Sequence, residues 1–375
     1  MMRSLRLLAL ALVVVFAGLP AGSSFRDALA QDKTKVTVFE AWFIHNESMG
    51  SPTAVEKGLF EGLDVRVVGG GPGLSSIDRV MAESKGGGIA FGVDYPYNLL
   101  EAREKQKLPL VAVAHDFQKS AVRLISWKEI KSAKDIDGTV ATWIGYDKQV
   151  KAAIGPDWAK KIKVVNQQGD PATIGSWLKK DYPFAHAMIY NEILVAKRTA
   201  KEKYWTYSFS DFGIDWPENV VFTTEETVKK HPKVVQAFLA GRYKGYKQAL
   251  ANRDEAVQTL MKYNSNLKGQ EKHELEGMEA IASVMVTADT KAKGLGYIDP
   301  AGWDRVARDL TKAGFYTLGL VEGMNGHGDV DQDGVVYINE LDMYASARVR
   351  QLSGGLQNPT IGRPPGIRPF PIAKP

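Results

Sequence analysis

The 375-residue sequence contains no cysteine. It therefore cannot form disulfides, cysteine nucleophiles or thiolate metal sites, and a packed core must hold the fold together. Its six histidines are scattered, without a His-x-x-x-His or His-Glu-x-x-His pair, so we interpret them as surface or core side chains and not as metal ligands. Neither sign of charge dominates, because the net charge is +5 and the basic residues are spread out, so nucleic acid binding is not expected.

Apolar runs long enough to cross a membrane are also missing beyond the N-terminus. The first thirty residues place Arg3 and Arg6 before an apolar run at residues 7–19, and small residues follow up to residue 30. This pattern predicts a secretory signal segment at residues 1–30, cleaved before Gln31. The alternative is an uncleaved membrane anchor, which the short apolar run disfavours.

Hydrophobic residues make up 44% of the chain, enough for a sizeable core. From about residue 36, short β-branched runs such as "KVTVFEAWF", "LDVRVVGG" and "GIAFGV" alternate with helical patterns such as "LSSIDRVMAESKGG". A second series begins at "VRLISW" and contains "TVATWI" and "KIKVVNQ". After residue 217 the pattern is mainly helical and includes a helix from Pro300 to Gly314. Two such series predict an α/β protein of two lobes, each with a mostly parallel sheet and helices on both faces.

Three stretches resemble the substrate-binding proteins of bacterial ABC transporters, in the group that carries sulfonates, nitrate or thiamin-pyrimidine precursors. They are "SPTAVEKGLFEGLDVRVVGGGPG", "AVAHDFQKSAVRLISWKEIKSAKDIDGTVAT" and "VKKHPKVVQAFLAGRYKGYKQALANRDEAV", and the resemblance spans about residues 36–290. It implies a type II periplasmic-binding-protein-like fold, with a hinge crossed twice and a ligand in the cleft. The expected domains are residues 31–118 with 208–317 for the first lobe and residues 119–207 for the second.

Ligands of open α/β sheets lie beyond the carboxyl ends of the strands. The glycine-rich loop at residues 69–76 offers backbone N–H groups and hydroxyls to an anionic or polar group, although a plain strand-to-helix turn explains it equally. Other loops combine aromatic rings with polar groups, which favours an organic ligand, while packing stays an alternative for each ring. The candidate ligand-binding residues are Trp42, His45, Asn46, Gly71, Gly73, Ser75, Asp94, Tyr95, Trp143, Tyr146, Tyr190 and Asn191.

An enzyme is the main alternative from another class. The same resemblance reaches eukaryotic pyrimidine synthases that consume their own histidine and pyridoxal phosphate. Those enzymes carry a cysteine-rich motif and a His-x-Pro sequence near the first helix. Here Gly50 precedes Pro52 at that spacing, and cysteine is absent, so we expect no catalytic activity.

The sequence from residue 318 to 375 resembles the C-terminal end of bacterial caspase-like peptidases. That end has an acidic loop, an "EL-x-x-Y" helix and a proline-rich finish, here "GGLQNPTIGRPPGIRPFPIAKP". The catalytic part of that family depends on cysteine, so no protease activity is implied. We expect a tail at residues 318–352 and an extended end at residues 353–375, joined to the lobes by gene fusion or by a recombination of two reading frames.

Within the tail, "DVDQDGVVYINE" has the pattern of a twelve-residue calcium loop. The expected ligands are the carboxylates of Asp329, Asp331, Asp333 and Glu340 and the carbonyl of Val335. The glycine-rich segment before the loop argues against a full incoming helix, and no second loop is present to pair with it. We therefore expect weak calcium binding, with a Kd of about 10⁻⁴ to 10⁻³ M, and an acidic turn that binds nothing is the alternative.

These observations predict an exported, periplasmic or cell-surface protein that captures a small organic or anionic ligand and delivers it to a membrane permease as a monomer. A ligand-sensing module without a transporter, or a non-catalytic caspase-related adaptor with a calcium-binding tail, is the alternative.

Overall fold

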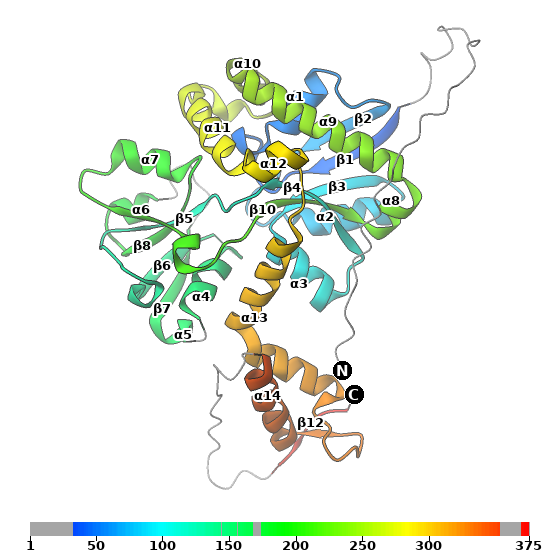
Figure 1. The fold of residues 1–375 in the computed structure, drawn as a ribbon, viewed down its shortest axis with the longest axis vertical. Coiled ribbons are helices and arrows are strands. Elements are labelled where there is room, and N and C mark those ends of the chain that lie inside the picture. The colour runs from blue at the N-terminus through cyan, green and yellow to red at the C-terminus, as the bar shows by residue number, and fades with distance from the viewer. Residues whose placement is uncertain (1–32, 144, 156, 168–173, 353–368, 375) are drawn as a thin grey trace. The chain divides into compact units, whose positions relative to one another are not determined.

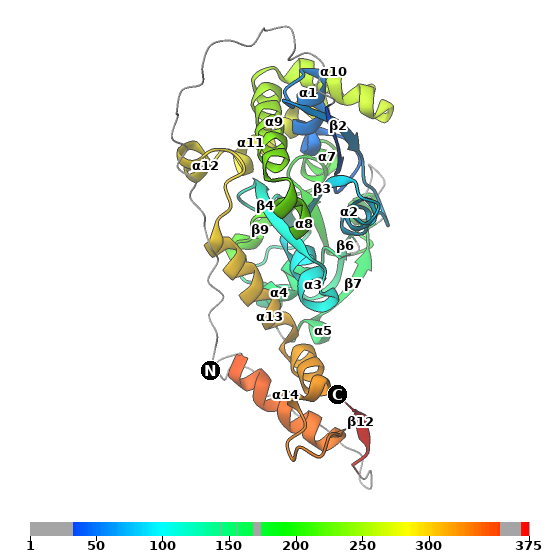
Figure 2. The same ribbon diagram turned by 90° about the vertical axis from the view of Figure 1, so that its right-hand side faces the viewer.

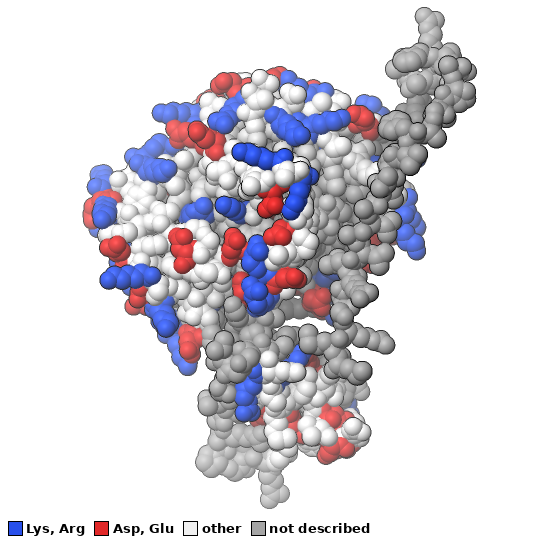
Figure 3. Space-filling model, in the orientation of Figure 1, with Lys and Arg blue, Asp and Glu red and all other residues white. Residues whose placement is uncertain are grey.

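The computed structural model describes residues 33–143, 145–155, 157–167, 174–352 and 369–374. The predicted signal segment and most of the proline- and glycine-rich end lie outside the described residues. No helix in the described part of the chain has the length and apolar character needed to cross a bilayer. Lysines and arginines alternate with acidic residues over the face drawn in Figure 3, which agrees with the spread of charge along the sequence.

The first sheet has the strand order β2-β1-β3-β10-β4, and in Figure 1 its strands β1 to β4 run from blue to cyan while β10 is green. Its strands are β1 (Thr34–Phe39), β2 (Leu63–Val68), β3 (Ile89–Asp94), β4 (Leu110–Phe117) and β10 (Glu218–Thr224). β1 pairs in parallel with β2 and β3, and β10 lies antiparallel between β3 and β4. The carboxyl ends of β1, β2 and β3 therefore meet at one edge of the sheet.

The second sheet, green in Figure 1, has the order β7-β6-β8-β5-β9. Its strands are β5 (Val122–Ser126), β6 (Gly138–Thr142), β7 (Ile162–Asn166), β8 (Phe184–Met188) and β9 (Trp205–Ser208). β6 is parallel to β7 and β8, while β5 is antiparallel to both of its neighbours, β8 and β9. Each sheet thus has one antiparallel strand, in the fourth position.

The chain passes between the sheets twice, at residues 118–121 and at residues 209–217, and each passage leads directly into the antiparallel strand of the next sheet. The mainly helical pattern predicted after residue 217 is wrong at its start, because β10 occupies Glu218–Thr224. All seven residues of β10 are buried. Because two of them, Glu218 and Asn219, are polar, the hydrophobic pattern of the sequence does not mark this segment as a buried strand.

Helices cover the sheets, and local chemistry sets where several of them begin. The side chain of Ser75 accepts a hydrogen bond from Asp78 N–H and starts one helix, and Pro96 occupies the first turn of the next. The α-helices between β1 and β10 are α1 (Gly50–Glu56), α2 (Ser76–Lys85), α3 (Pro96–Gln106), α4 (Lys148–Ile154), α5 (Trp158–Lys161), α6 (Gly175–Leu178) and α7 (Glu192–Thr199). Those that follow are α8 (Glu225–Lys230), α9 (Pro232–Ala251), α10 (Arg253–Tyr263), α11 (Glu271–Met285), α12 (Ala288–Lys293), α13 (Pro300–Glu322) and α14 (Ile338–Leu352).

A buried ionic cluster anchors α9 to the first sheet. Arg242, with no exposed side-chain surface, contacts Glu40 at 2.7 Å and Asp116 at 2.6 Å, just past β1 and at the end of β4 respectively. The hydroxyl groups of Tyr243 and Tyr246 both donate to Asp116, at 2.9 and 3.4 Å. One guanidinium thus pairs with two buried carboxylates, which fixes α9 over the strands.

The C-terminal region differs from its predicted structure. α13 continues past Gly314 to Glu322, so a helix precedes the acidic loop, but the backbone of η6 (Gly323–His327) is non-helical at Asn325 and Gly326, and this glycine-rich segment separates the helix from the loop. A glycine inside a helix costs only about 1 kcal/mol, and the packing of α13 against α14 offsets it. Figure 2 shows these two helices side by side. Arg348 and Tyr344 of α14 both bind the carboxylate of Glu322, at 2.6 and 3.2 Å.

Candidate ligand-binding cleft

A cavity of about 300 Å³, called here the first cavity, lies where the carboxyl ends of strands from both sheets meet. Trp42 follows β1, and Tyr95 follows β3 directly. Trp143 follows β6, and Tyr190 follows β8, from the other sheet. A volume of this size suits a small organic molecule.

Aromatic rings form much of the wall. The rings of Tyr95 and Tyr146 lie 4.5 Å apart, edge to face, and Trp143 stands 5.6 Å from Tyr146 in the same geometry. Tyr190 lies 5.7 Å from the imidazole of His45. Tyr95, Trp143 and Tyr190 are buried. Tyr95 belongs to the first lobe and the other two to the second, so the rings of this wall come from both lobes. An aromatic wall of this kind offers flat faces to a ring or to a cationic group.

Polar groups enter the first cavity from the loop after β1. His45 Nε2 lies 3.2 Å from Glu47 Oε2, and His45 Nδ1 lies 3.0 Å from Asn46 Oδ1. Asn46 N–H donates to Glu274 Oε2 at 2.8 Å, and Asn219 donates to Glu47 Oε1 at 2.5 Å. Glu47 and Glu274 are both buried, so two carboxylates face one imidazole here.

The charges of these groups follow from their neighbours. Burial alone would lower the pKa of His45, but the hydrogen bond and charge of Glu47, with the charge of Glu274, outweigh it and raise the pKa to about 9. Burial works to raise the pKa of Glu47, and the contact with His45 overcomes it, so the pKa is lowered. Burial raises the pKa of Glu274. At neutral pH, His45 and Glu47 therefore form an ion pair.

A second cavity, of about 420 Å³, shares Trp42, Trp143 and Tyr146 with the first, and we call the two together the cleft. Its wall includes the glycine-rich loop after β2, together with Asn166 at the end of β7 and Gln167 directly after it. Gln167 is buried and donates to the carbonyl of His186 at 2.9 Å, while its Oε1 has no hydrogen-bond partner among the residues that the structure describes.

The predicted residues divide between the two cavities. Trp42, His45, Asn46, Tyr95, Trp143, Tyr146, Tyr190 and Asn191 line the first cavity. Gly71, Gly73, Ser75 and Asp94 line the second. Several polar groups of this second set serve the fold, since Asp94 accepts from Ser76, Tyr95 and Asn98 at 2.5, 2.8 and 2.7 Å.

A third part of the wall comes from residues 264–274, at the end of α10 and the start of α11. His273 Nε2 lies 2.9 Å from Asn191 Oδ1, so this segment also contacts the second lobe. Glu192 lines the cavity beside the predicted Tyr190 and Asn191. Glu47, His273 and Glu274 also line it but were not among the predicted residues. Glu47 adjoins predicted residues and could have been found; nothing in the local pattern marks residues 264–274.

Comparison with known proteins assigns this chain to a family. Residues 45–256, more than half of the chain, match the family described as "NMT1/THI5 like". The chain belongs to the NMT1/THI5-like family.

Relatives of this NMT1/THI5-like protein include solute-binding proteins. It is 22% identical over 326 residues to the formylaminopyrimidine-binding protein of Halalkalibacterium halodurans, covering 81% of this chain and 92% of the relative. A structure from Bordetella bronchiseptica RB50 has a TM-score of 0.56 at 13% identity, covering 75% of this chain and 90% of its own. The periplasmic nitrate-binding protein NrtA of Synechocystis PCC 6803 has a TM-score of 0.50 at 14% identity, covering 88% and 90%. These structures confirm the predicted two-lobed α/β fold.

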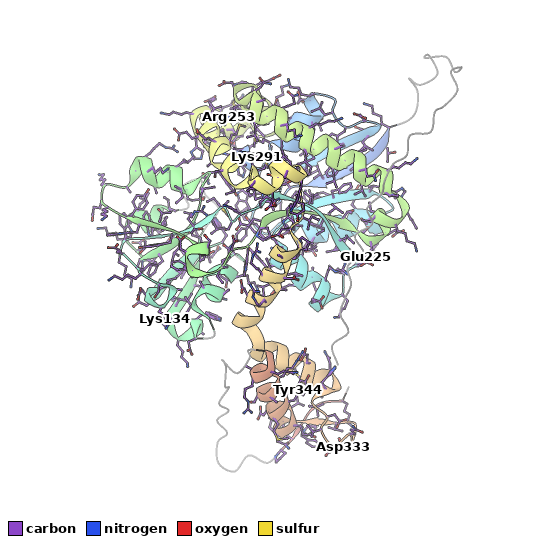
Figure 4. The ribbon with its side chains drawn as sticks, viewed as in Figure 1. Lys134, Glu225, Arg253, Lys291, Asp333 and Tyr344 are labelled. Carbon is purple, nitrogen blue, oxygen red and sulfur yellow. The ribbon has the colours of Figure 1, made fainter. Side chains whose placement is uncertain are left out.

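The NMT1/THI5-like match ends before the acidic loop. Carboxylate oxygens of Asp329, Asp331 and Asp333 lie within 4.8 Å of one another, and Asp333 projects from the loop in Figure 4. Gly334 has φ of +83°, which permits the turn. Glu340 accepts from the N–H groups of Val330 and Tyr337, at 3.3 and 2.8 Å. After the loop, β11 (Val336–Tyr337) pairs with β12 (Pro371–Ala373) near the end of the chain.

Proposed function

We propose that this protein is the exported solute-binding component of an ABC transporter, and that it captures a small organic ligand between its lobes. The observation that carries the proposal is the cleft, whose walls come from the carboxyl ends of strands in both sheets. Two short crossovers join these sheets, the arrangement in which lobes close on a ligand by a hinge motion. The closed form is then the one that a membrane permease recognises.

We further propose that the ligand is bound without being converted. The resembling pyrimidine synthases use a cysteine-rich motif, which this sequence lacks. A sensing module without a transporter would use the same closure, and only the protein that receives the closed form separates the two roles. Ligand closure is therefore the property to test first.

The absence of cysteine allows a direct test of closure. Lys134 lies on the second lobe and Glu225 follows β10 of the first sheet; both are exposed and labelled in Figure 4. Spin labels on Lys134→Cys and Glu225→Cys in one chain report the distance between the lobes by pulsed electron resonance. We expect a screen of amines, pyrimidines, sulfonates and nitrate to yield a compound that raises the melting temperature and narrows this distance distribution. If no compound does either, the transport hypothesis fails.

We also propose that the loop at residues 329–340 binds calcium. Its three aspartates supply the hard oxygen ligands that calcium prefers, and α13 and α14 flank it. The role would be to order the C-terminal region and not to contribute to the cleft.

A further inference from the structure

The cleft is acidic in a chain whose net charge is +5. Among the described residues, no lysine or arginine lines either cavity. Six carboxylates do: Glu47, Glu192 and Glu274 in the first cavity and Asp78, Asp94 and Glu101 in the second. An anion entering the cleft would meet this charge without an unpaired cation to offset it.

The cationic side chains in and near the cleft that could hold an anion are already paired. The imidazole of His45 pairs with Glu47. In the glycine-rich loop, the Ser76 hydroxyl donates to Asp94, and the Ser75 hydroxyl accepts from Asp78 N–H. Arg198 and Lys148 are also paired, with Glu276 at 2.8 Å and Glu101 at 2.9 Å.

Acceptors, in contrast, remain available. Glu274 uses Oε2 on the N–H of Asn46, and its Oε1 has no hydrogen-bond partner among the described residues. Gln167 Oε1, on the wall of the second cavity, is buried and has no hydrogen-bond partner in the described part of the chain. A buried acceptor without a donor is costly, so Gln167 Oε1 favours a ligand with N–H groups, and Glu274 Oε1 offers such a ligand a second acceptor.

The aromatic wall supports the same ligand chemistry. Trp143, Tyr146, Tyr95 and Tyr190 surround the first cavity, which the carboxylate of Glu274 also lines. The negative face of an aromatic ring attracts a cation within about 6 Å, and the attraction increases when both are desolvated. Aromatic faces combined with a carboxylate constitute a site for a positively charged nitrogen.

We propose that the cleft binds an organic cation, an amidinium or ammonium group on a small apolar body, whose charged nitrogen lies among these rings and donates to Glu274. The proposal rests on the solute-binding function above and names its ligand class. The cation replaces the missing donor for Glu274 Oε1 and partly neutralises the carboxylates of the cleft.

A series of probes with one ring and different charges tests the class. Benzamidine, benzamide and benzenesulfonate are titrated separately into the purified protein by calorimetry, at low salt and pH 7. We expect benzamidine to bind at least about 10-fold more tightly than benzamide, the size expected of a charge-assisted hydrogen bond, and benzenesulfonate not to bind. Choline and its uncharged isostere 3,3-dimethylbutan-1-ol provide a second pair, for which the same order is expected.

Variants locate the site. Glu274→Gln keeps the shape and removes the charge, and should weaken benzamidine binding by about 10- to 100-fold. Glu279→Gln is the matched control on the same helix, because the Glu279 side chain is 77% exposed. Tyr146→Leu should weaken binding by about 2- to 30-fold and Tyr146→Phe much less, since phenylalanine keeps the ring face. Melting curves of each variant identify any loss of folding, and the probe series on the unchanged protein does not depend on the variants.

The outcomes separate the ligand class from the function. Tighter binding of benzenesulfonate or benzamide than of benzamidine, with closure of the lobes, would overturn the cation proposal and leave solute binding intact. Binding of none of the probes also counts against the cation proposal. The solute-binding function itself fails only if the broader screen produces neither stabilisation nor closure.

Discussion

Glu218 accepts a hydrogen bond from the backbone N–H of Ala121 at 2.7 Å; Ala121 lies on the first crossover between the lobes, and Glu218 begins β10 directly after the second. The same carboxylate accepts from the Ser120 hydroxyl at 2.5 Å and from Gln149 of α4 at 3.2 Å. One buried side chain thus joins both crossovers to the second lobe. Burial raises its pKa to about 7, against the lowering effect of the bonds from Ser120 and Ala121.

This pKa predicts a pH dependence of stability. Because the pKa of folded Glu218 lies above its ordinary value of 4.5, the stabilisation by its proton is complete below pH 4.5 and is lost as the pH rises through 7. A displacement of this size corresponds to about 3 kcal/mol. Glu218→Gln mimics the protonated form, so the variant should match the unchanged protein at pH 4 and exceed its stability by about 2–4 kcal/mol at pH 8.5.

Urea unfolding at half-unit pH intervals measures the difference between the two proteins. Glu129→Gln, an exposed change on the second lobe, serves as the control and should give a flat difference. A flat difference for Glu218→Gln as well would show that this carboxyl does not titrate in that range.

The ionic cluster around Arg242 predicts a large loss of stability when the Arg242 side chain is replaced by an uncharged one. Arg242→Met leaves Glu40 and Asp116 buried without their cation, which should lower the free energy of unfolding by about 3–5 kcal/mol. Adding Glu40→Gln and Asp116→Asn removes the unpaired charges and should restore part of the loss. Chemical unfolding of the single and triple variants tests this, and a triple variant no more stable than the single would contradict the electrostatic explanation.

Gly277 of α11 predicts a steric effect on the cleft. A Cβ atom at this position would lie 2.0 Å from Asn46 Nδ2 and 2.7 Å from the carbonyl of Tyr190. Gly277→Ala should therefore displace Asn46 and weaken ligand binding by about 10-fold or more, with a lower melting temperature. Gly175→Ala is the matched control, because its Cβ would meet nothing within 4 Å. Equal affinity for the two variants, measured by calorimetry with any ligand from the screen, would refute the expectation.

The acidic loop predicts a response to calcium that magnesium does not reproduce. We expect 10 mM calcium chloride to raise the melting temperature, and Asp331→Asn or Glu340→Gln to reduce that shift by removing a carboxylate ligand. Asp304→Asn, an exposed change on α13, should keep it. If Glu340→Gln responds like the unchanged protein, Glu340 is not the twelfth-position ligand.

The sequence was sufficient to place the cleft where strands end. Trp42, Tyr95, Trp143 and Tyr190 each follow a parallel strand, and the carboxyl ends of parallel strands meet at one edge, so the pattern along the chain indicated proximity in space. Gly71 and Ser75 follow a strand, Asp94 ends one, and all three line the cleft. The side chains of Ser75 and Asp94, however, form hydrogen bonds with neighbouring residues, which the spacing of residues in the sequence does not reveal.

Other features depend on contacts between distant segments. Glu274 reaches the cavity because α11 packs against the loop that carries Asn46, 228 residues away in the chain. β10 is hard to recognise in the sequence because it begins with Glu218, whose buried carboxyl meets its hydrogen-bond partners, such as Ser120 and Ala121, only in the folded protein. The extension of α13 past Gly314 depends on α14, which follows it in the chain.

The strand order has a consequence for synthesis on the ribosome. β4 has only β10 as a partner in the first sheet, and β10 is more than a hundred residues later in the chain. The second sheet, in contrast, is contained entirely within residues 122–208. The lobe that begins later can therefore complete its sheet first during translation, while β4 waits with both edges unpaired for the chain to return.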